Sequence, residues 1–193
     1  PFASDTMSTS LNSQGFVLNN QPYSASPWNY SGDEIVLNIP ENVVDWVQVQ
    51  LRTGTDSAST VATRSAFICK NGMVTDLDGY SPVSFSGIAD GNYYVVIRHR
   101  NHLAVMTANP LALSADTTLY DMTTGQDKAY GSLPLVELST GVYGIPTGDA
   151  NANGQIQNDD KNDFWNNQVG QAGYKSADFN VNGQVQNDDK NDY

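Results

Sequence analysis

The sequence predicts a mostly β protein, an antiparallel β-sandwich that is followed by a small module of two repeated loops with short helices. In the first part, short apolar runs alternate with turns that contain Gly, Asn or Asp, about 8–12 residues apart, which is typical of sandwiches. In the last part, residues 153–164 and 182–193 differ at two positions only. A repeat this close indicates one supersecondary unit that is used twice.

These patterns divide the chain into three parts. Residues 1–31 form the arm, residues 32–147 the body with the predicted sandwich, and residues 148–193 the tail with the repeated loops. The arm is polar and loop-like, but it is too aromatic for a free linker. We therefore expect it to lie against the body or against a neighbouring molecule, through its large apolar residues Phe2, Phe16, Val17, Leu18, Tyr23, Trp28 and Tyr30.

Period-two alternation and turn residues define the strands expected in the body. Asn71-Gly72 is a strong hairpin signal between two of them. No helical pattern of useful length occurs before residue 158. The expected strands are residues 34–39, 43–52, 60–70, 82–85, 92–99, 103–106, 111–113 and 118–120.

The strand at 43–52 is the clearest example. Val47, Val49 and Leu51 face one side, and the glutamines between them face the other. This alternation predicts a half-buried strand. Trp46 falls on the polar side, where packing at an edge under a loop is favoured over a role as a ligand platform.

Composition limits the class of protein. The net charge is −12 with nine Lys plus Arg, which argues against nucleic acid as a partner. The sequence is rich in Asn, Ser, Thr, Gly and Tyr and poor in charge, which favours a secreted β protein. No apolar run reaches about 18 residues, so no membrane span is expected. The start at Pro1, without a methionine or a signal peptide, suggests a processed mature form.

Two single features bear on an extracellular location. Cys69 is the one cysteine, which leaves no intrachain disulfide. We interpret it as a small buried residue on a strand rather than as a reactive thiol. Asn29-Tyr30-Ser31 is a glycosylation-type sequon, which makes Asn29 a possible attachment site.

Each copy of the repeat, extended upstream, has the spacing of a twelve-residue calcium loop. The loops run from Asp149 to Asp160 (loop 1) and from Asp178 to Asp189 (loop 2). Oxygen-bearing residues alternate along each loop, and a glycine at position 6 allows a sharp turn. The apolar residues at position 8, Ile156 in loop 1 and Val185 in loop 2, point away from the ion and can pair with each other.

We therefore expect two Ca²⁺ sites. Position 7 of each loop would contribute its backbone carbonyl, and position 9 would act directly or through water. With few carboxylates in each loop, the affinity is expected to be modest and suited to calcium-rich surroundings outside cells. The alternative is a polar tail that holds no ion. The expected metal-binding residues are Asp149, Asn151, Asn153, Gln155, Gln157 and Asp160 in loop 1, and Asp178, Asn180, Asn182, Gln184, Gln186 and Asp189 in loop 2.

Two further clusters have a structural and a functional interpretation. The segment 98–102, Arg-His-Arg-Asn-His, is the one basic cluster. Structural hydrogen bonds or salt bridges are favoured there over recognition of an acidic partner, such as the Asp-rich tail of another copy, and over catalysis. Asp76 and Asp78 before Gly79 are interpreted as an ordinary turn, with a third calcium site as the alternative.

The tail resembles a dockerin module, with two calcium loops in tandem that each open a short helix and end on Asp instead of Glu. Cohesin-binding dockerins usually carry small hydroxyl residues at loop positions 10 and 11. This chain has Asn158-Asp159 and Asn187-Asp188 there, and it ends before a complete second helix.

The body carries a second resemblance. Residues 83–95 resemble the glycine-containing corner of prealbumin-like and collagen-adhesin B-type modules, in which a tyrosine packs beneath the corner. The whole chain is similar to C-terminal regions of large secreted surface proteins of Bacteroidetes-type bacteria. The matching stretches are residues 43–47, 74–79, 98–103 and 148–151.

These observations lead to a function hypothesis without catalysis. We expect a secreted, calcium-binding structural protein that assembles with copies of itself, as a homopolymer, or with other surface proteins into an extracellular filament, tube or surface layer. The alternative is a glycan-binding or anchoring module of a larger secreted enzyme or adhesin, with Trp28 or Trp46 as a sugar platform.

Overall fold

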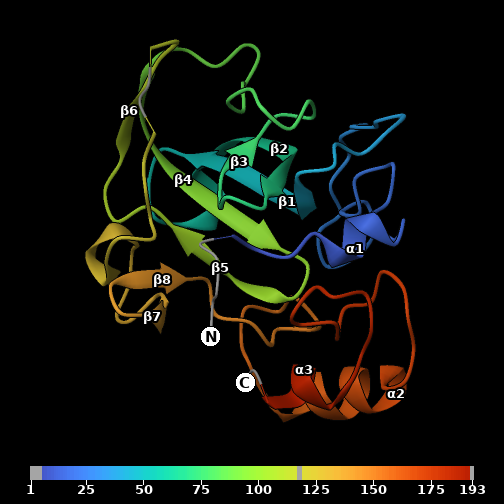
Figure 1. Cartoon of the computed structure of the whole chain (residues 1–193). Coiled ribbons are helices and arrows are strands. Elements are labelled where there is room, and N and C mark those ends of the chain that lie inside the picture. The colour runs from blue at the N-terminus through green and yellow to red at the C-terminus, as the bar shows by residue number, and fades with distance from the viewer. Residues whose placement is uncertain (1–5, 117–118, 192–193) are drawn as a thin grey trace.

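The computed structural model describes residues 6–116 and 119–191, and its centre is an antiparallel sheet of six strands (Figure 1). The strand order is β3-β2-β1-β4-β5, and β6 pairs with the first residues of β4. Strands account for 29% and helices for 14%, which confirms the mostly β, antiparallel class. The strands of the sheet are β1 (Val43–Arg52), β2 (Thr60–Cys69), β3 (Val74–Thr75), β4 (Gly91–His99), β5 (His102–Met106) and β6 (Leu111–Leu113).

The long strand β1 lies at the centre because both of its edges are paired. Trp46 lies opposite Phe67 of β2, and Val49 lies opposite both Arg64 of β2 and Ile97 of β4. The sequence predicts the bounds of this strand correctly, as the alternation of Val and Leu with Gln requires. The predicted hairpin at residues 71–72 is also present, between β2 and β3.

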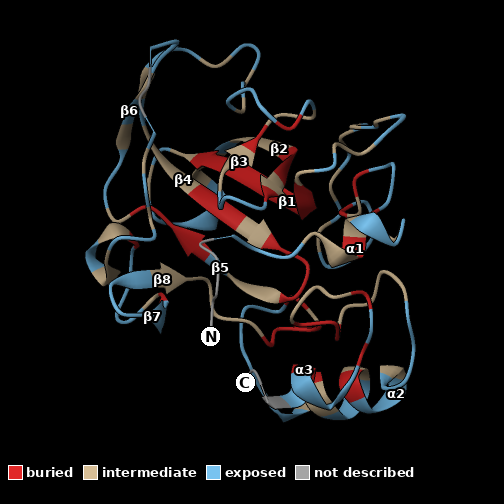
Figure 2. Cartoon of the chain, in the orientation of Figure 1, coloured by how far each residue is buried: buried red, intermediate tan, exposed pale blue. Residues whose placement is uncertain are grey.

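Both faces of the sheet are covered, and this corrects the expectation that β1 is half buried (Figure 2). The arm lies over one face, where Leu11 and Tyr23 are fully buried against Trp46 and Phe67. Gln48 and Gln50 are therefore buried as well, because the arm covers the face that was expected to meet water. The described part of the arm lies on its own body, which is one of the two arrangements expected.

The opposite face of the sheet has its own core. Val47, Val49, Ile97 and Val105 pack there with Ala129 and Leu135 from the segment after β6. This segment holds β7 (Val136–Ser139) and β8 (Val142–Gly144), a two-stranded hairpin that the sequence pattern did not predict. The covering layer on this face is thus a short hairpin with irregular chain.

Two expected strands are absent from the described structure. Residues 34–39 do not join the sheet, because they run beside the arm with one isolated bridge between Asn20 and Ile35. Residues 82–85 form no ladder, and Arg64 donates instead to the carbonyl of Ser84. The prediction at 118–120 lies partly outside the described residues, and Leu119 and Tyr120 are not in a strand.

Short helices complete the described structure, and half of them belong to the tail. The arm holds α1 (Ser10–Ser13), and two single helical turns are η1 (Ser57–Ser59) and η2 (Gln126–Lys128). In the tail, each loop leads into helix, as expected, with a separate small core of Trp165, Phe179 and Val185 among others. No helix among the described residues is long and apolar enough to cross a membrane. The helical elements of the tail are η3 (Asp160–Trp165), α2 (Asn166–Gln168) and α3 (Asn187–Asn191).

Candidate metal centre and its attachment to the body

Position 1 of each loop is an aspartate whose two carboxylate oxygens are held by backbone amides. Asp149 in loop 1 accepts from the amides at positions 5 and 6 at 3.0 and 2.9 Å. Asp178 in loop 2 accepts from the equivalent amides, both at 2.9 Å. The glycines at position 6 have φ of +86° and +88°, a conformation that glycine adopts without steric cost. The two loops therefore share the sharp turn that the spacing predicts.

Position 12 closes each loop in the same way. Asp160 accepts from the amides at positions 3 and 9 at 3.2 and 2.7 Å. Asp189 accepts from the equivalent amides at 3.2 and 2.7 Å, and also from the amide of Phe179 at 2.8 Å. The first and last residues of each loop thus accept hydrogen bonds from backbone amides of the residues between them.

The asparagines at positions 3 and 5 form local turns. In all four cases, the side-chain oxygen accepts from the backbone amide two residues further on, at 2.8–3.1 Å. This fixes the orientation of the amide oxygens. The asparagines are Asn151 and Asn153 in loop 1, and Asn180 and Asn182 in loop 2.

The glutamines at positions 7 and 9 lie on the outside of the loops. The side chain of Gln157 donates to that of Gln155, and Gln186 donates to Gln184 in the same way. All four are exposed. Their side chains therefore bond to each other, which leaves the backbone carbonyl of position 7 as the contribution expected from this part of the loop.

The pairing expected between the two position-8 residues is not formed. Val185 is fully buried, whereas Ile156 is 37% exposed. Val185 instead exchanges backbone hydrogen bonds with Gly170 and Gln171, in the chain after α2. Loop 2 is therefore tied into the tail by its position 8, and loop 1 is not.

The donor set suits a hard cation. The four aspartates at positions 1 and 12 are at most 2% exposed, and buried charges require a partner or a metal. Burial raises the pKa of Asp149 and Asp189, and it raises that of Asp178 to about 6. In the described chain no three His, Cys, Asp or Glu side chains form a metal group, so carbonyl and amide oxygens would have to complete a calcium sphere.

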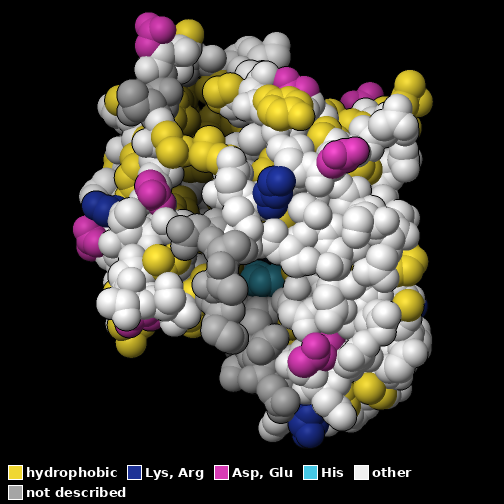
Figure 3. Space-filling model, viewed as in Figure 1, with side chains coloured by type: hydrophobic (Ala, Val, Ile, Leu, Met, Phe, Trp, Pro, Cys, Tyr) yellow, Lys and Arg dark blue, Asp and Glu magenta, His cyan; other side chains and the backbone are white. Residues whose placement is uncertain are grey.

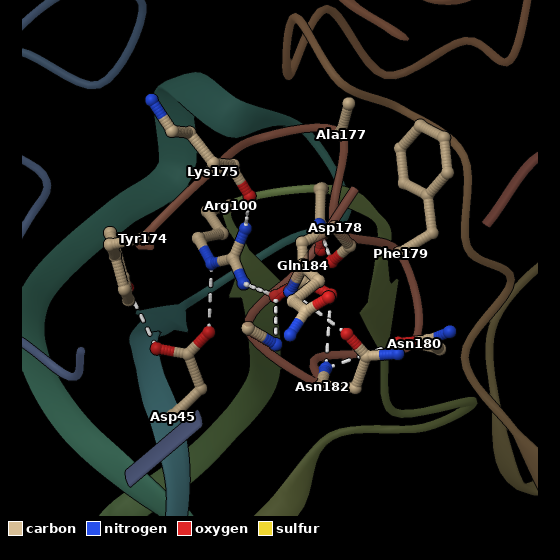
Figure 4. Close-up of polar contacts among 12 residues, drawn as sticks. Asp45, Arg100, Tyr174, Lys175, Ala177, Asp178, Phe179, Asn180, Asn182 and Gln184 are labelled. Carbon is tan, nitrogen blue, oxygen red and sulfur yellow. Dashed lines mark hydrogen bonds and ion pairs between the residues drawn. The ribbon is translucent and has the colours of Figure 1, made fainter. Parts of the chain in front are cut away.

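The basic cluster joins the body to the tail of the same chain. Arg100 is 7% exposed and lies between Asp45 of β1 and Asp178 of loop 2 (Figure 4). Its Nε donates to Asp45 Oδ2 at 2.8 Å, and its Nη2 lies 3.7 Å from Asp178 Oδ2. Its guanidinium also lies over the ring of Tyr174 and donates to the carbonyl of Lys175. These contacts are the structural salt bridges favoured from sequence, and the acids that Arg100 meets belong to the same chain rather than to another copy.

Asn101, the next residue, contacts position 1 of both loops. Its backbone carbonyl accepts from the amide of Asp149 at 3.2 Å and from that of Gly148 at 3.0 Å. Its side chain donates to the carbonyl of Asp178 at 2.7 Å, and Asn101 is fully buried. The turn between β4 and β5 therefore holds the start of each loop.

Asp45 is the centre of the network beneath this turn. It accepts from the Tyr174 hydroxyl at 2.7 Å and lies 3.0 Å from His99 Nε2. Burial alone would raise the pKa of Asp45, but the Arg100 charge and the His99 contact hold it well below its usual range. His99 Nδ1 lies 2.9 Å from His102 Nδ1, and burial, with His99 and Arg100 nearby, lowers the pKa of His102.

The sequence analysis did not identify Asp45 or Tyr174 as functional residues. A signal for Asp45 was present, because it is the one acid in β1 and only apolar residues and glutamines separate it from Arg52 at the strand end. Such a residue needs a buried partner. Tyr174 carries no comparable signal, since nothing in the sequence brings residues 129 positions apart together.

The two tryptophans considered as a sugar platform have contacts within the protein, and the sequon asparagine is exposed. Trp46 is fully buried and donates to the carbonyl of Leu18, which contradicts its use as a sugar platform. The ring of Trp28 lies against Tyr23. The Arg98 guanidinium covers this ring, with its central carbon 4.3 Å from the ring centroid of Trp28. Asn29 is exposed, as a glycosylation site requires.

The turn at residues 76–79 and the cysteine follow the simpler interpretations. Asp76 pairs with Arg64 at 2.6 Å, while Asp78 bonds to Ser81, so the two acids serve different partners. Cys69 is buried on β2, as expected.

Comparison with known proteins gives no relative. No protein-family model matches the chain, and no significant match is found among curated proteins or solved structures. The functional argument therefore depends on the geometry of the site.

Proposed function

We propose that the protein is an extracellular, non-catalytic structural protein in which two calcium ions fix the tail as a rigid surface. The observation that carries this proposal is the pair of equivalent loops, each with two buried aspartates. A hard cation bound among these oxygens would supply the positive charge that the buried carboxylates lack. In a chain with one cysteine, bound ions would take the stabilising place of disulfides.

The proposal includes a finer description of the fold. We classify the body as an Ig-like or prealbumin-like sandwich and the tail as a dockerin-like module. The corner at residues 83–95 supports the first, since Tyr93 donates from its hydroxyl to the carbonyl of Ala89 at 2.9 Å beneath the turn. The similar hydrogen bonding of the two loops supports the second.

We further propose that the protein assembles with copies of itself or with other surface proteins. On the face in Figure 3, hydrophobic side chains gather mainly over the body, and little charge covers the tail. The hairpin of β7 and β8 supports the proposal, because it forms a small sheet separate from the main one and carries exposed apolar side chains. These side chains are Val136, Leu138 and Val142, which are 41–45% exposed, and the neighbouring Leu133, which is 78% exposed.

Calcium binding can be tested on the purified chain. Isothermal titration calorimetry should show two ions per chain, and excess chelator should lower the melting temperature, because an ion that binds only the folded state stabilises it. At calcium about 1,000 times Kd, each site contributes about 4 kcal/mol. Absence of both binding heat and a melting shift would contradict the proposal.

Assembly needs a separate measurement. Light scattering over a range of protein concentrations, with calcium present, should show species larger than one chain. Val136→Lys with Leu138→Lys should reduce them, because it places charge on the exposed hairpin. A monomer at every concentration would remove assembly from the proposal and leave calcium binding untouched.

A further inference from the structure

The two loops are alike in their ligands but not in their surroundings. Positions 1 and 12 are aspartates in both, and burial does not distinguish them, since all four are at most 2% exposed. The loops differ in how the nearest arginine contacts their aspartates. Arg100 Nη2 lies 3.7 Å from Asp178 Oδ2 in loop 2, and no other ion pair to a loop aspartate occurs in the part of the chain that the structure describes.

The position of Arg100 is fixed from several sides. Its Nε bonds to Asp45, and its plane lies over Tyr174. Nη2 is buried and has no hydrogen-bond partner, so this donor is directed at loop 2 without being satisfied there.

Arg98 is a comparison within the same strand. Its guanidinium lies over Trp28, and it forms no ion pair with Asp149 of loop 1 among the described residues. Arg98 and Asp149 line the same small pocket, so loop 1 has a positive charge nearby that is not in an ion pair with it. Loop 2 has a positive charge in an ion pair with its position 1, at 3.7 Å. Calcium affinity in such loops depends on the charge of the ligands.

We propose that Arg100 acts as a built-in counter-ion of loop 2, so that loop 1 is the tighter calcium site and loop 2 the weaker one. This inference depends on the proposed calcium binding. The Arg100 charge stabilises Asp178 when no ion is present and repels an ion that enters. Loop 2 then stays attached to the body without calcium, whereas loop 1 depends on its ion.

Calcium titrations of the whole chain test this inference. Wild-type protein should show two dissociation constants at least tenfold apart. Variants that remove one loop at a time assign the two constants. Asp160→Ala and Asp189→Ala should remove the tighter and the weaker constant, respectively.

Variants of Arg100 then isolate its charge. Arg100→Met should strengthen calcium binding to loop 2 at least fivefold. Because that change leaves Asp45 buried without its cation, the double variant Asp45→Asn with Arg100→Met provides a neutral replacement. Arg100→Lys keeps the charge and should keep the difference between the loops. Arg98→Met, the matched control, should leave loop 2 unchanged.

The outcomes separate the two proposals. Equal constants in the wild type, or an unchanged loop 2 in a folded double variant, would overturn the role of Arg100 while calcium binding stands. Absence of binding to either loop would overturn the proposed function itself.

Discussion

The hydroxyl of Tyr174 donates to Asp45 Oδ1 at 2.7 Å, so a residue of the tail shares its hydrogen-bond acceptor with the turn of the body. The other oxygen of the same carboxylate accepts from Arg100 at 2.8 Å. Asp45 is fully buried, and its charge is therefore matched entirely by protein groups. This carboxylate joins the central strand, the β4–β5 turn and the tail.

Asp45→Ala should therefore destabilise the protein strongly. Removal of one partner leaves Arg100 buried and unpaired, which costs about 3–5 kcal/mol. Urea unfolding followed by circular dichroism measures the loss. Asp127→Ala is the control, since Asp127 pairs with Lys128 at the surface and is 78% exposed. It should cost less than about 0.5 kcal/mol. A similar small loss for both variants would contradict the role given to Asp45.

The loops offer a matched pair at position 6. Gly154→Ala and Gly183→Ala impose the same backbone strain, because the two φ values are nearly equal. At Gly154 a new Cβ meets nothing within 4 Å, but at Gly183 it lies 3.0 Å from both Gln14 and Phe16 of the arm. Each change should cost about 1–2 kcal/mol through strain, and Gly183→Ala should cost more. Thermal melting of both variants checks this difference, and equal losses would show that the arm does not lie against loop 2.

Because the arm is buried on the sheet, truncation of one of its core side chains should cost more stability than truncation of an exposed side chain. Leu11→Ala should cost about 2–5 kcal/mol, because Leu11 is fully buried between the arm and the sheet. Leu37→Ala, at a side chain that is 89% exposed, should change stability by less than about 0.5 kcal/mol. Urea unfolding of the two variants makes the comparison. If Leu11→Ala proved as mild as its control, the arm would not contribute to the core in solution.

Stability should fall on mild acidification with calcium at saturation. The pKa of His102 in the folded state is well below its usual value of about 6.5, because of burial and the neighbouring His99 and Arg100, with Asp45 opposing. Below about pH 6.5, the unfolded chain binds a proton that the folded chain does not, so the free energy of unfolding decreases as the pH falls. Urea unfolding between pH 7.5 and 5.5 should show a weaker dependence in His102→Gln. The same slope in both proteins would contradict this prediction.

The last prediction concerns calcium binding by the aspartates at position 12 of the two loops. Asp160→Ala and Asp189→Ala should each abolish binding of one calcium ion and lower the melting temperature in calcium. Asp163→Ala should do neither, because Asp163 is exposed and lies outside loop 1. Calorimetric stoichiometry distinguishes the three variants. Two ions bound by Asp160→Ala would show that the loop assignment is wrong.

Local patterns predicted the strands that pair with their neighbours in the chain. The bounds of β1 follow from alternation, and the position of β4 follows from its continuous apolar run after the turn at Asp90-Gly91. The same patterns were wrong at residues 34–39. There the side chain of Asn19 donates hydrogen bonds to the carbonyls of Val36 and Leu37, and no sheet partner does so among the described residues. Alternation shows that one side is apolar, but it does not show which segment supplies the hydrogen bonds.

The turn of each loop was predictable for a different reason. The positions that define it lie within twelve residues, so spacing alone places Asp149 and Asp160 at its two ends, and calcium binding there stays a prediction. The attachment of the loops was not predictable, because Asp45 and Arg100 lie 55 positions apart. Contacts at that separation depend on the order of the strands, which short-range periodicity does not encode.

Asn101 has a consequence for how the two loops communicate. One residue holds the carbonyl of Asp178 with its side chain and the amide of Asp149 with its backbone. A shift of either loop on losing its ion would displace the same buried residue, and the other loop would be displaced with it. Coupling between the two ions, measured as the change in calcium affinity of one loop when Asp160→Ala or Asp189→Ala removes the other site, would therefore have a route through the body.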